Sequence, residues 1–347
     1  MSADSALAHA IKQLAHDRSL TQDEAAAAFG VIMRGEATPA QVAGLLMALR
    51  VKQGGETSDE VAGVARALRE AMVLLPAADR DTLVDTCGTG GGSVPTFNIS
   101  TAAALLAAGA GLRVAKHGNR SFTSRSGSAD VLEALGVPLD LSVERLAQVL
   151  KQADIVFMFA PAMHPAMKHV GPVRRELAVP TVMNIVGPLA NPARAGRQVV
   201  GVAEQRRLGL LASALQTLGS RRALVVYGEP GLDEISPLGV THVHEVRDGS
   251  VSEWTIEPAT LGIRGGIPED LAGGTPADNA AIVTDVLAGR GNPTATAAVV
   301  LNAAAALYVA DAAPTFPGCL AQARAALESG RGTAALERLQ RASKPVQ

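Results

Sequence analysis

A chain of 347 residues that is 48% hydrophobic and 18% charged can form one large or two unequal globular domains, and this composition excludes a disordered protein. The formal net charge of −2 and the aromatic content of 3% argue against nucleic-acid binding, base stacking and attraction to an anionic membrane. The two cysteines form no CxxC pair or disulfide framework, the N-terminus is charged and the apolar stretches are short, so we expect a cytoplasmic protein without a signal peptide or membrane span.

The first 75 residues are predicted to be wholly helical. Three segments, Thr21–Glu24, Thr38–Gln41 and Thr57–Glu60, match the capping box, in which a threonine and a Glu or Gln three residues later satisfy free amides at a helix start. Pro39 occupies a first helical position, and Gly54–Gly55 ends the helix that it begins. These helices predict a small helical domain over residues 1–75, which would suit dimerisation.

From residue 82 the pattern changes to strands that alternate with helices. Strands are predicted at 82–88, 112–118, 155–160, 198–203 and 223–228, and a hairpin is predicted around Asp248–Gly249. Helices are predicted over Ser100–Ala110, from about Ser128, after Ser142 and from about Asp278. This alternation predicts an α/β domain over residues 76–347 with a central, mostly parallel sheet flanked by helices.

The stretch DTCGTGGGSVPTFNIS (85–100) places a glycine-rich loop between the first strand and the next helix. Glycines at 88 and 90–92 let several backbone amides point at one anion, and the positive end of the helix faces the same space. The loop therefore predicts a phosphate or pyrophosphate site, and a turn that needs glycine only for its geometry is the alternative. A Walker loop is excluded because no GK[ST] is present, and Ser93 stands where a dinucleotide-binding GxGxxG would need glycine.

A second polar loop, AKHGNRSFTSRSGSAD (115–130), follows the second strand. Its cations lie among hydroxyl groups and glycines, a composition that suits an anion with several oxygens. A solvated polar loop is the alternative, but two such loops at neighbouring strand ends favour anion binding.

Two further groups follow later strands. Asp233 and Glu234 are adjacent carboxylates of the kind that share Mg²⁺ with a phosphate ligand, although such pairs are also common on solvated surfaces. His164 and His169 are five residues apart, which does not fit a helical zinc pair, and no cysteine accompanies them.

Taken together, these motifs resemble the anthranilate phosphoribosyltransferase family. The segments GTGG…TFNIST, VAKHGNRS…SGSADVLEALGV, HPAMKHVGPVRREL, NIVGPLANPA and the Asp-Glu pair occur in the family's order and cover nearly the whole chain. KHGNRS with SGSADVLEALG is specific, whereas GTGG is shared with pyrimidine nucleoside phosphorylases. The resemblance implies transfer of the phosphoribosyl group of phosphoribosyl pyrophosphate to the amino group of anthranilate, in tryptophan biosynthesis, with Mg²⁺ present. It also implies a homodimer that forms through the helical domain, and a helical segment near 164–190 that joins this domain.

The resemblance also implies which residues bind each ligand. Those implied for phosphoribosyl pyrophosphate are Gly88, Thr89, Gly90, Gly91, Gly92, Thr96, Asn98, Ile99, Ser100, Thr101, Lys116, His117, Gly118, Asn119, Arg120, Ser121, Thr123, Ser124 and Ser128. Those implied for anthranilate are Gly88, Asn119 and Arg174, with His117 close by, and those implied for Mg²⁺ are Ser100, Asp233 and Glu234. No catalytic acid or base is assigned, because the aniline nitrogen can attack an oxocarbenium-like ribose without a strong base.

The sequence departs from the family pattern at two places. Gly92 and Ser93 stand where the family often reads Asp-Gly, so a carboxylate near the pyrophosphate is lost, and Met163 replaces a frequent second histidine near the anthranilate entrance. Two other functions stay open as alternatives. A pyrimidine nucleoside phosphorylase is disfavoured by KHGNRS, and a silent nucleic-acid-binding relative is disfavoured by the net charge.

Overall fold

Four helices open the chain, and the last three begin at the predicted threonine caps. The computed structural model describes residues 3–121 and 125–344. Thr21, Thr38 and Thr57 each accept a hydrogen bond from the amide three residues later, and the Glu or Gln there bonds back to the cap, as predicted. The helices are α1 (Ala3–Ala15), α2 (Gln22–Met33), α3 (Pro39–Val51) and α4 (Ser58–Ala71).

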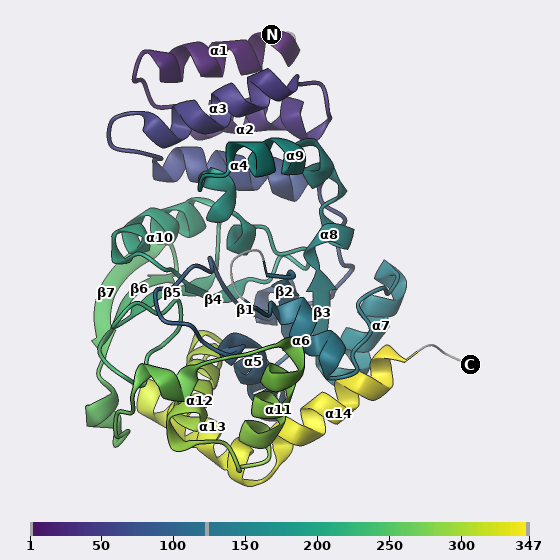
Figure 1. Cartoon of the computed structure of the whole chain (residues 1–347), viewed down its shortest axis with the longest axis vertical. Coiled ribbons are helices and arrows are strands. Elements are labelled where there is room, and N and C mark those ends of the chain that lie inside the picture. The colour runs from purple at the N-terminus through teal and green to yellow at the C-terminus, as the bar shows by residue number, and fades with distance from the viewer. Residues whose placement is uncertain (1–2, 122–124, 345–347) are drawn as a thin grey trace.

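A later segment, between β3 (Ile155–Phe159) and β4 (Arg197–Gly201), packs on α2, α3 and α4 and completes the helical domain (Figure 1). It contains α8 (Ala160–Met163), η2 (Pro165–His169), α9 (Gly171–Leu177), η3 (Val182–Asn184) and η4 (Gly187–Leu189). Buried side chains of this segment, such as Val173 and Leu189, belong to the same apolar cluster as Phe29 and Leu45. The cluster continues into α10 (Leu208–Thr217) and into the sheet at Val200 and Val225, while a separate apolar cluster fills the rest of the α/β domain.

Seven strands form a single sheet in the order β3-β2-β1-β4-β5-β6-β7. They are β1 (Val84–Gly88), β2 (Val114–Gly118), β3 (Ile155–Phe159), β4 (Arg197–Gly201), β5 (Arg222–Gly228), β6 (Thr241–Arg247) and β7 (Ser250–Ile256). The first five in sequence are parallel and the last two are antiparallel. Asp248 and Gly249 join β6 to β7 with φ of 49° and 75°, as a tight hairpin turn requires, so the predicted hairpin is confirmed.

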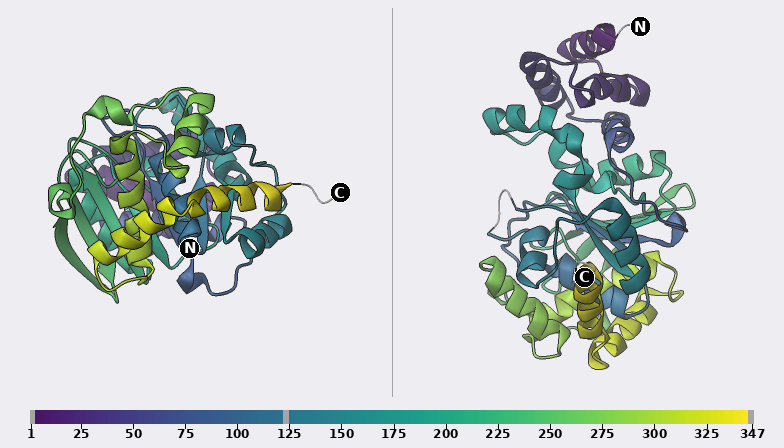
Figure 2. Two further views of the ribbon diagram at one scale, coloured as in Figure 1. Left: turned by 90° about the horizontal axis from the view of Figure 1, so that it is seen from below. Right: turned by 90° about the vertical axis from the view of Figure 1, so that its right-hand side faces the viewer.

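Helices cover both faces of the sheet, so the predicted α/β architecture is confirmed. The remaining helices of the α/β domain are α5 (Ile99–Gly109), α6 (Ser128–Ala134), α7 (Val143–Ala153), α11 (Pro276–Leu287), α12 (Pro293–Val309), α13 (Phe316–Glu328) and α14 (Arg331–Ser343). Figure 2 shows the C-terminal helices gathered on the side away from the helical domain. Short 3₁₀ segments complete the chain at η1 (Arg80–Thr82), η5 (Gln205–Arg207), η6 (Pro258–Leu261) and η7 (Pro268–Leu271).

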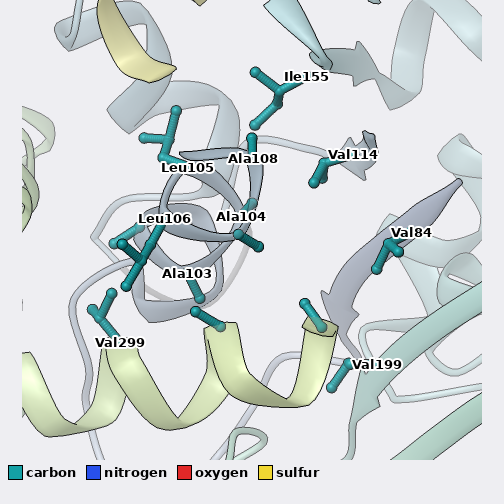
Figure 3. Packing of buried hydrophobic residues seen from close by; sticks show 14 of the residues in the cluster. Val84, Ala103, Ala104, Leu105, Leu106, Ala108, Val114, Ile155, Val199 and Val299 are labelled. Carbon is teal, nitrogen blue, oxygen red and sulfur yellow. The ribbon is translucent and has the colours of Figure 1, made fainter. Parts of the chain in front are cut away.

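Helix α5 is buried on nearly all sides and is rich in alanine, which lets its neighbours approach closely. Its Leu106 packs towards Val299 of α12, and Ala104 lies towards Val84 of β1 (Figure 3). Helices α12 and α14 both contact α5. This packing fixes the N-terminus of α5 at the end of β1, beside the glycine-rich loop.

Candidate active site

Three segments that are far apart in the sequence meet at the carboxyl ends of the parallel strands. The amide of Gly90 donates to Oδ2 of Asp233 at 2.9 Å, and the amide of Ser100 donates to Oε1 of Glu234 at 3.0 Å. Nζ of Lys116 donates to Oγ of Ser100 at 3.2 Å. In the strand order, β2 and β3 lie on one side of β1, whereas β4 and β5 lie on the other. Open α/β sheets usually bind ligands at such a reversal of the strand order. The glycine loop, the second polar loop and the acidic pair therefore form one site.

The glycine loop is shaped by close approach to the segment that carries the acidic pair. Gly90 and Gly91 have φ of 69° and 83°, which a side chain would strain. A Cβ atom on Gly88 would lie 2.6 Å from Oδ2 of Asp233, and one on Gly92 would lie 2.9 Å from the carbonyl oxygen of Gly231. Gly92 and Ser93, which depart from the family pattern, thus both lie against the Gly231 carbonyl, because the Ser93 amide also donates to it at 2.9 Å.

Burial disfavours the charged form of the acidic pair, Asp233 and Glu234, whereas a bound divalent cation would favour it. Burial and the neighbouring Asp233 raise the pKa of Glu234 to about 8, and burial raises the pKa of Asp233. In the described part of the chain, no group of three or more His, Cys, Asp or Glu side chains could hold a metal ion. Two carboxylates that share the cation with substrate oxygens are a usual Mg²⁺ arrangement, so these residues fit Mg²⁺ brought by a phosphate ligand.

Side-chain hydrogen bonds connect β1 and β2 around Lys116. Its Nζ donates to the carbonyl of Thr86 at 2.5 Å, and Oδ1 of the fully buried Asp85 accepts the amide of His117 at 3.2 Å. Asn191 donates to Oδ2 of Asp85 at 2.7 Å and to the carbonyl of Ala115 at 2.8 Å. Burial lowers the pKa of Lys116, and the charge of Asp85 opposes this shift. Sequence reasoning missed Asp85 and Asn191, although a carboxylate inside a buried strand needs a partner.

The second polar loop is tied to the start of α6. The carbonyl of Asn119 accepts Oγ of Ser128 at 3.3 Å, and a Cβ on Gly118 would lie 2.2 Å from the same Oγ. Arg120 pairs with Asp130 at 2.7 Å and with Glu133 at 2.9 Å. The guanidinium expected to contact phosphate is thus engaged by two carboxylates. The amide of Ser121 donates to Asp130 at 3.3 Å. Thr123 and Ser124 lie outside the described residues.

The start of α5 offers backbone more than side chains. Ile99 and Thr101 are each 1% exposed, so only their backbone groups can face a ligand. Oδ1 of Asn98 accepts Nδ2 of Asn279 at 2.8 Å, which holds the side chain predicted to bind substrate. Thr96 lies before the start of α5 and is partly exposed. Thr89, in the glycine loop, donates its amide to the carbonyl of Gly201 at 2.9 Å.

Comparison with known proteins decides the family. Residues 8–72 match the "Glycosyl transferase family, helical bundle domain", and residues 80–333 match the "Glycosyl transferase family, a/b domain". Anthranilate phosphoribosyltransferase of Anaeromyxobacter sp. (strain K) is 50% identical over 331 residues, which cover 95% of this chain and 96% of the relative. The chain belongs to the anthranilate phosphoribosyltransferase family. The corresponding protein of Herpetosiphon aurantiacus is 48% identical over 335 residues, covering 96% of this chain and 98% of the relative.

Solved structures of anthranilate phosphoribosyltransferases share the whole fold. The Thermus thermophilus enzyme superposes with a TM-score of 0.91 at 42% identity, covering 97% of this chain and 99% of that chain. The Saccharomyces cerevisiae enzyme in complex with PRPP and Mg superposes with a TM-score of 0.88 at 26% identity, covering 97% of each chain. The resemblance and the fold class inferred from the sequence are therefore confirmed.

Two buried histidines face each other beside the second loop of this anthranilate phosphoribosyltransferase family member. The ring centroids of His117 and His164 are 5.0 Å apart. Burial, with His164 and Lys116 nearby, lowers the pKa of His117 to about 3, and burial lowers the pKa of His164 to about 4. Both rings are therefore neutral at pH 7, and their planes are tilted by 51° to each other.

Arg174, predicted to bind the carboxylate of anthranilate, lies on α9 in the helical domain. Its Nη2 donates to Oδ1 of Asn184 at 3.4 Å, and burial lowers the pKa of the guanidinium. The side chain is partly buried without a carboxylate partner within ion-pair distance among the described residues. Its role towards anthranilate stays a prediction.

The neutral histidine pair predicts a specific acid sensitivity. Each histidine has an ordinary pKa of 6.5, so the unfolded chain gains protons below about pH 6.5 that the folded protein does not bind until about pH 4 or below. Each should lower the free energy of unfolding by about 1.4 kcal/mol per pH unit within that window. The double variant His117→Gln/His164→Gln should show a shallower fall in urea midpoint from pH 6.5 to pH 4. Equal slopes in the two proteins would mean that the folded protein binds these protons.

Proposed function

We propose that this protein transfers the phosphoribosyl group of phosphoribosyl pyrophosphate to the amino group of anthranilate and releases pyrophosphate, with Mg²⁺ as cofactor, in tryptophan biosynthesis. The observation that carries the proposal is the contact of Asp233 with the Gly90 amide and of Glu234 with the Ser100 amide. These contacts bring the acidic pair, the glycine loop and the start of α5 into one site. The family membership and the relatives crystallised with PRPP and Mg or with 4-fluoroanthranilate support the same substrates.

In the proposed reaction, this chain's residues bind and orient more than they exchange protons. Glycine-loop amides other than those of Thr89, Gly90 and Ser93, which donate to protein oxygens, receive the phosphate oxygens. The Lys116 ammonium adds positive charge next to Ser100. Asp233, Glu234 and Ser100 would hold Mg²⁺, and the bound cation would supply positive charge that offsets the negative charge of the pyrophosphate leaving group. Asn119, Arg174 and the neutral His117 orient anthranilate, and holding both substrates in line supplies much of the rate.

Anthranilate fluorescence provides the direct test. Purified protein mixed with phosphoribosyl pyrophosphate and Mg²⁺ should consume anthranilate, and omission of any one component should stop the loss of fluorescence. No loss with folded protein would contradict the proposal. Phosphorolysis of pyrimidine nucleosides in that case would identify a phosphorylase, and retention of nucleic acid on a filter would identify a binding relative.

We further propose a cytoplasmic homodimer that associates through the helical domain, residues 1–75 with the segment near 164–190. Helix α3 contacts α9, and two exposed valines lie near this region, Val51 at 68% and Val179 at 44% exposure. Exposed apolar side chains of this kind favour a protein partner. No helix among the described residues is long and apolar enough to cross a membrane. Light scattering of the purified protein tests the dimer, and Val51→Glu should shift it towards monomer.

A further inference from the structure

Asn302 of α12 holds the chain directly after the acidic pair. Its Oδ1 accepts the amide of Ile235 at 2.9 Å, and its Nδ2 donates to the carbonyl of Ile235 at 3.0 Å. Nδ2 also donates to the carbonyl of Ala298 at 2.9 Å, one turn back in the helix. The side chain is 3% exposed, so all of these bonds are made away from water. A single carboxamide thus satisfies both backbone groups of one residue, as a neighbouring strand would.

The backbone around the acidic pair has little other polar support. Within the ranges 3–121 and 125–344, the backbone groups of residues 233–235 make no hydrogen bond to another backbone group. On the side of β4, a Cβ on Gly201 would lie 1.7 Å from the carbonyl oxygen of Asp233, so strand and segment are in direct contact. Asn302 of α12 contacts the same segment at Ile235. The segment is therefore fixed between a glycine and an asparagine that come from different elements.

The contact made by Asn302 is close enough to affect the carboxylates themselves. Asn302, Glu234 and Ser100 line the same small cavity, with Thr86 and Gly201. The side chain of Ile235 is fully buried, so this residue is anchored at both its backbone and its side chain. Movement at Ile235 would carry Glu234 with it and break the 3.0 Å bond to the Ser100 amide.

We propose that Asn302 is a positioning residue that holds Asp233 and Glu234 in the place where they receive a divalent cation. The proposal deepens the proposed function and rests on it for the identity of the ligand. Asn302 touches neither the cation nor the substrates, and it acts through the backbone of Ile235. A purely structural asparagine would lower stability when replaced but would leave cation affinity unchanged.

The experiment compares three variants by direct binding of Mn²⁺ in the presence of phosphoribosyl pyrophosphate, followed as the loss of the free Mn²⁺ paramagnetic resonance signal. Asn302→Leu keeps the number and branching of the side-chain heavy atoms and removes all three bonds, and Asn302→Asp keeps the acceptor for the Ile235 amide. The matched control is Thr294→Val on the same helix, which is also buried and donates to Asp270 at 2.8 Å, in a segment that does not bear the acidic pair. Urea midpoints and the KM for anthranilate complete the comparison.

Asn302→Leu should weaken Mn²⁺ binding at least tenfold and change the KM for anthranilate less than twofold, and Asn302→Asp should fall between it and wild type. Thr294→Val should lower the urea midpoint but bind Mn²⁺ as wild type does. Unchanged Mn²⁺ affinity in a folded Asn302 variant, or an equal loss in Thr294→Val, would overturn the proposal; Asn302→Asp decides if Asn302→Leu does not fold. Wild-type protein that binds Mn²⁺ but does not consume anthranilate would overturn the proposed function alone.

Discussion

Gly201→Ala is expected to lower kcat/KM for phosphoribosyl pyrophosphate at least 100-fold. The new Cβ would stand 1.7 Å from the carbonyl oxygen of Asp233, a separation that real Cβ atoms essentially never show. Gly201 cannot move away, because it ends β4 in register with Gly88 of β1 and Val226 of β5. The acidic segment must move instead, by roughly 1 Å, and a displacement of that size in an active site costs about 100-fold in rate. Steady-state kinetics with varied phosphoribosyl pyrophosphate measures the effect.

The matched control for this variant is Gly209→Ala in α10. A Cβ there would meet only the His244 ring at 3.7 Å, an ordinary contact, and alanine favours the helix over glycine by about 0.5–1 kcal/mol. Gly209→Ala should keep wild-type kinetics and an equal or higher melting temperature. Wild-type kinetics in Gly201→Ala would show that the position of the acidic pair does not limit the reaction.

The pair substitution Asp233→Asn/Glu234→Gln should raise stability while it removes activity. The folded pKa of Glu234, about 8, lies above its ordinary value of 4.5, so the unfolded chain releases this proton first as pH rises. The metal-free wild type therefore loses stability between about pH 4.5 and pH 8, and the loss is complete above pH 8. The amide variant has no such proton to lose. It should melt at a higher temperature than wild type at pH 8 in a chelator, and its kcat should fall more than about 1,000-fold because the cation site is gone.

Two measurements separate this expectation from a simple change in packing. The difference in melting temperature should shrink as the pH is lowered towards 4.5, where wild-type Glu234 is protonated in the folded protein. Addition of Mg²⁺ with phosphoribosyl pyrophosphate should raise the melting temperature of wild type but not of the variant. A variant that is less stable than metal-free wild type at pH 8 would contradict the account of the acidic pair.

Local signals in the sequence account for much of the fold. The capping boxes at Thr21, Thr38 and Thr57 lie within four residues each, and the Asp248–Gly249 turn needs only two residues with positive φ. Buried strands are recognisable as apolar runs. Because parallel strands end at one edge, their polar loops could be placed together from the sequence alone.

The supporting contacts could not be predicted, because they join residues that no local pattern relates. Asn302 lies 67 positions from Ile235, and Asn191 lies 106 positions from Asp85. Gly201 ends an ordinary buried strand. It must be glycine only because the segment that carries Asp233 packs directly against it. Arg120 shows the same limit, since its cationic character was evident but its pairing with Asp130 and Glu133 was not. Ligand contacts at the site residues remain predictions.

The apolar cluster that joins the helical domain to the sheet has a consequence for cooperativity. Phe29 and Leu45 share that cluster with Val182 from the middle of the chain and with Val200 and Val225 from the sheet. The helical domain does not enclose its own interior, and the α/β domain encloses by itself only the separate cluster around α5 and α12. A fragment of residues 1–75 would lack much of the surface that its helices cover, and a fragment of residues 76–347 would leave apolar strand and loop side chains in water. The two domains should therefore unfold in a single transition, and neither should be separable by limited proteolysis as a stable piece.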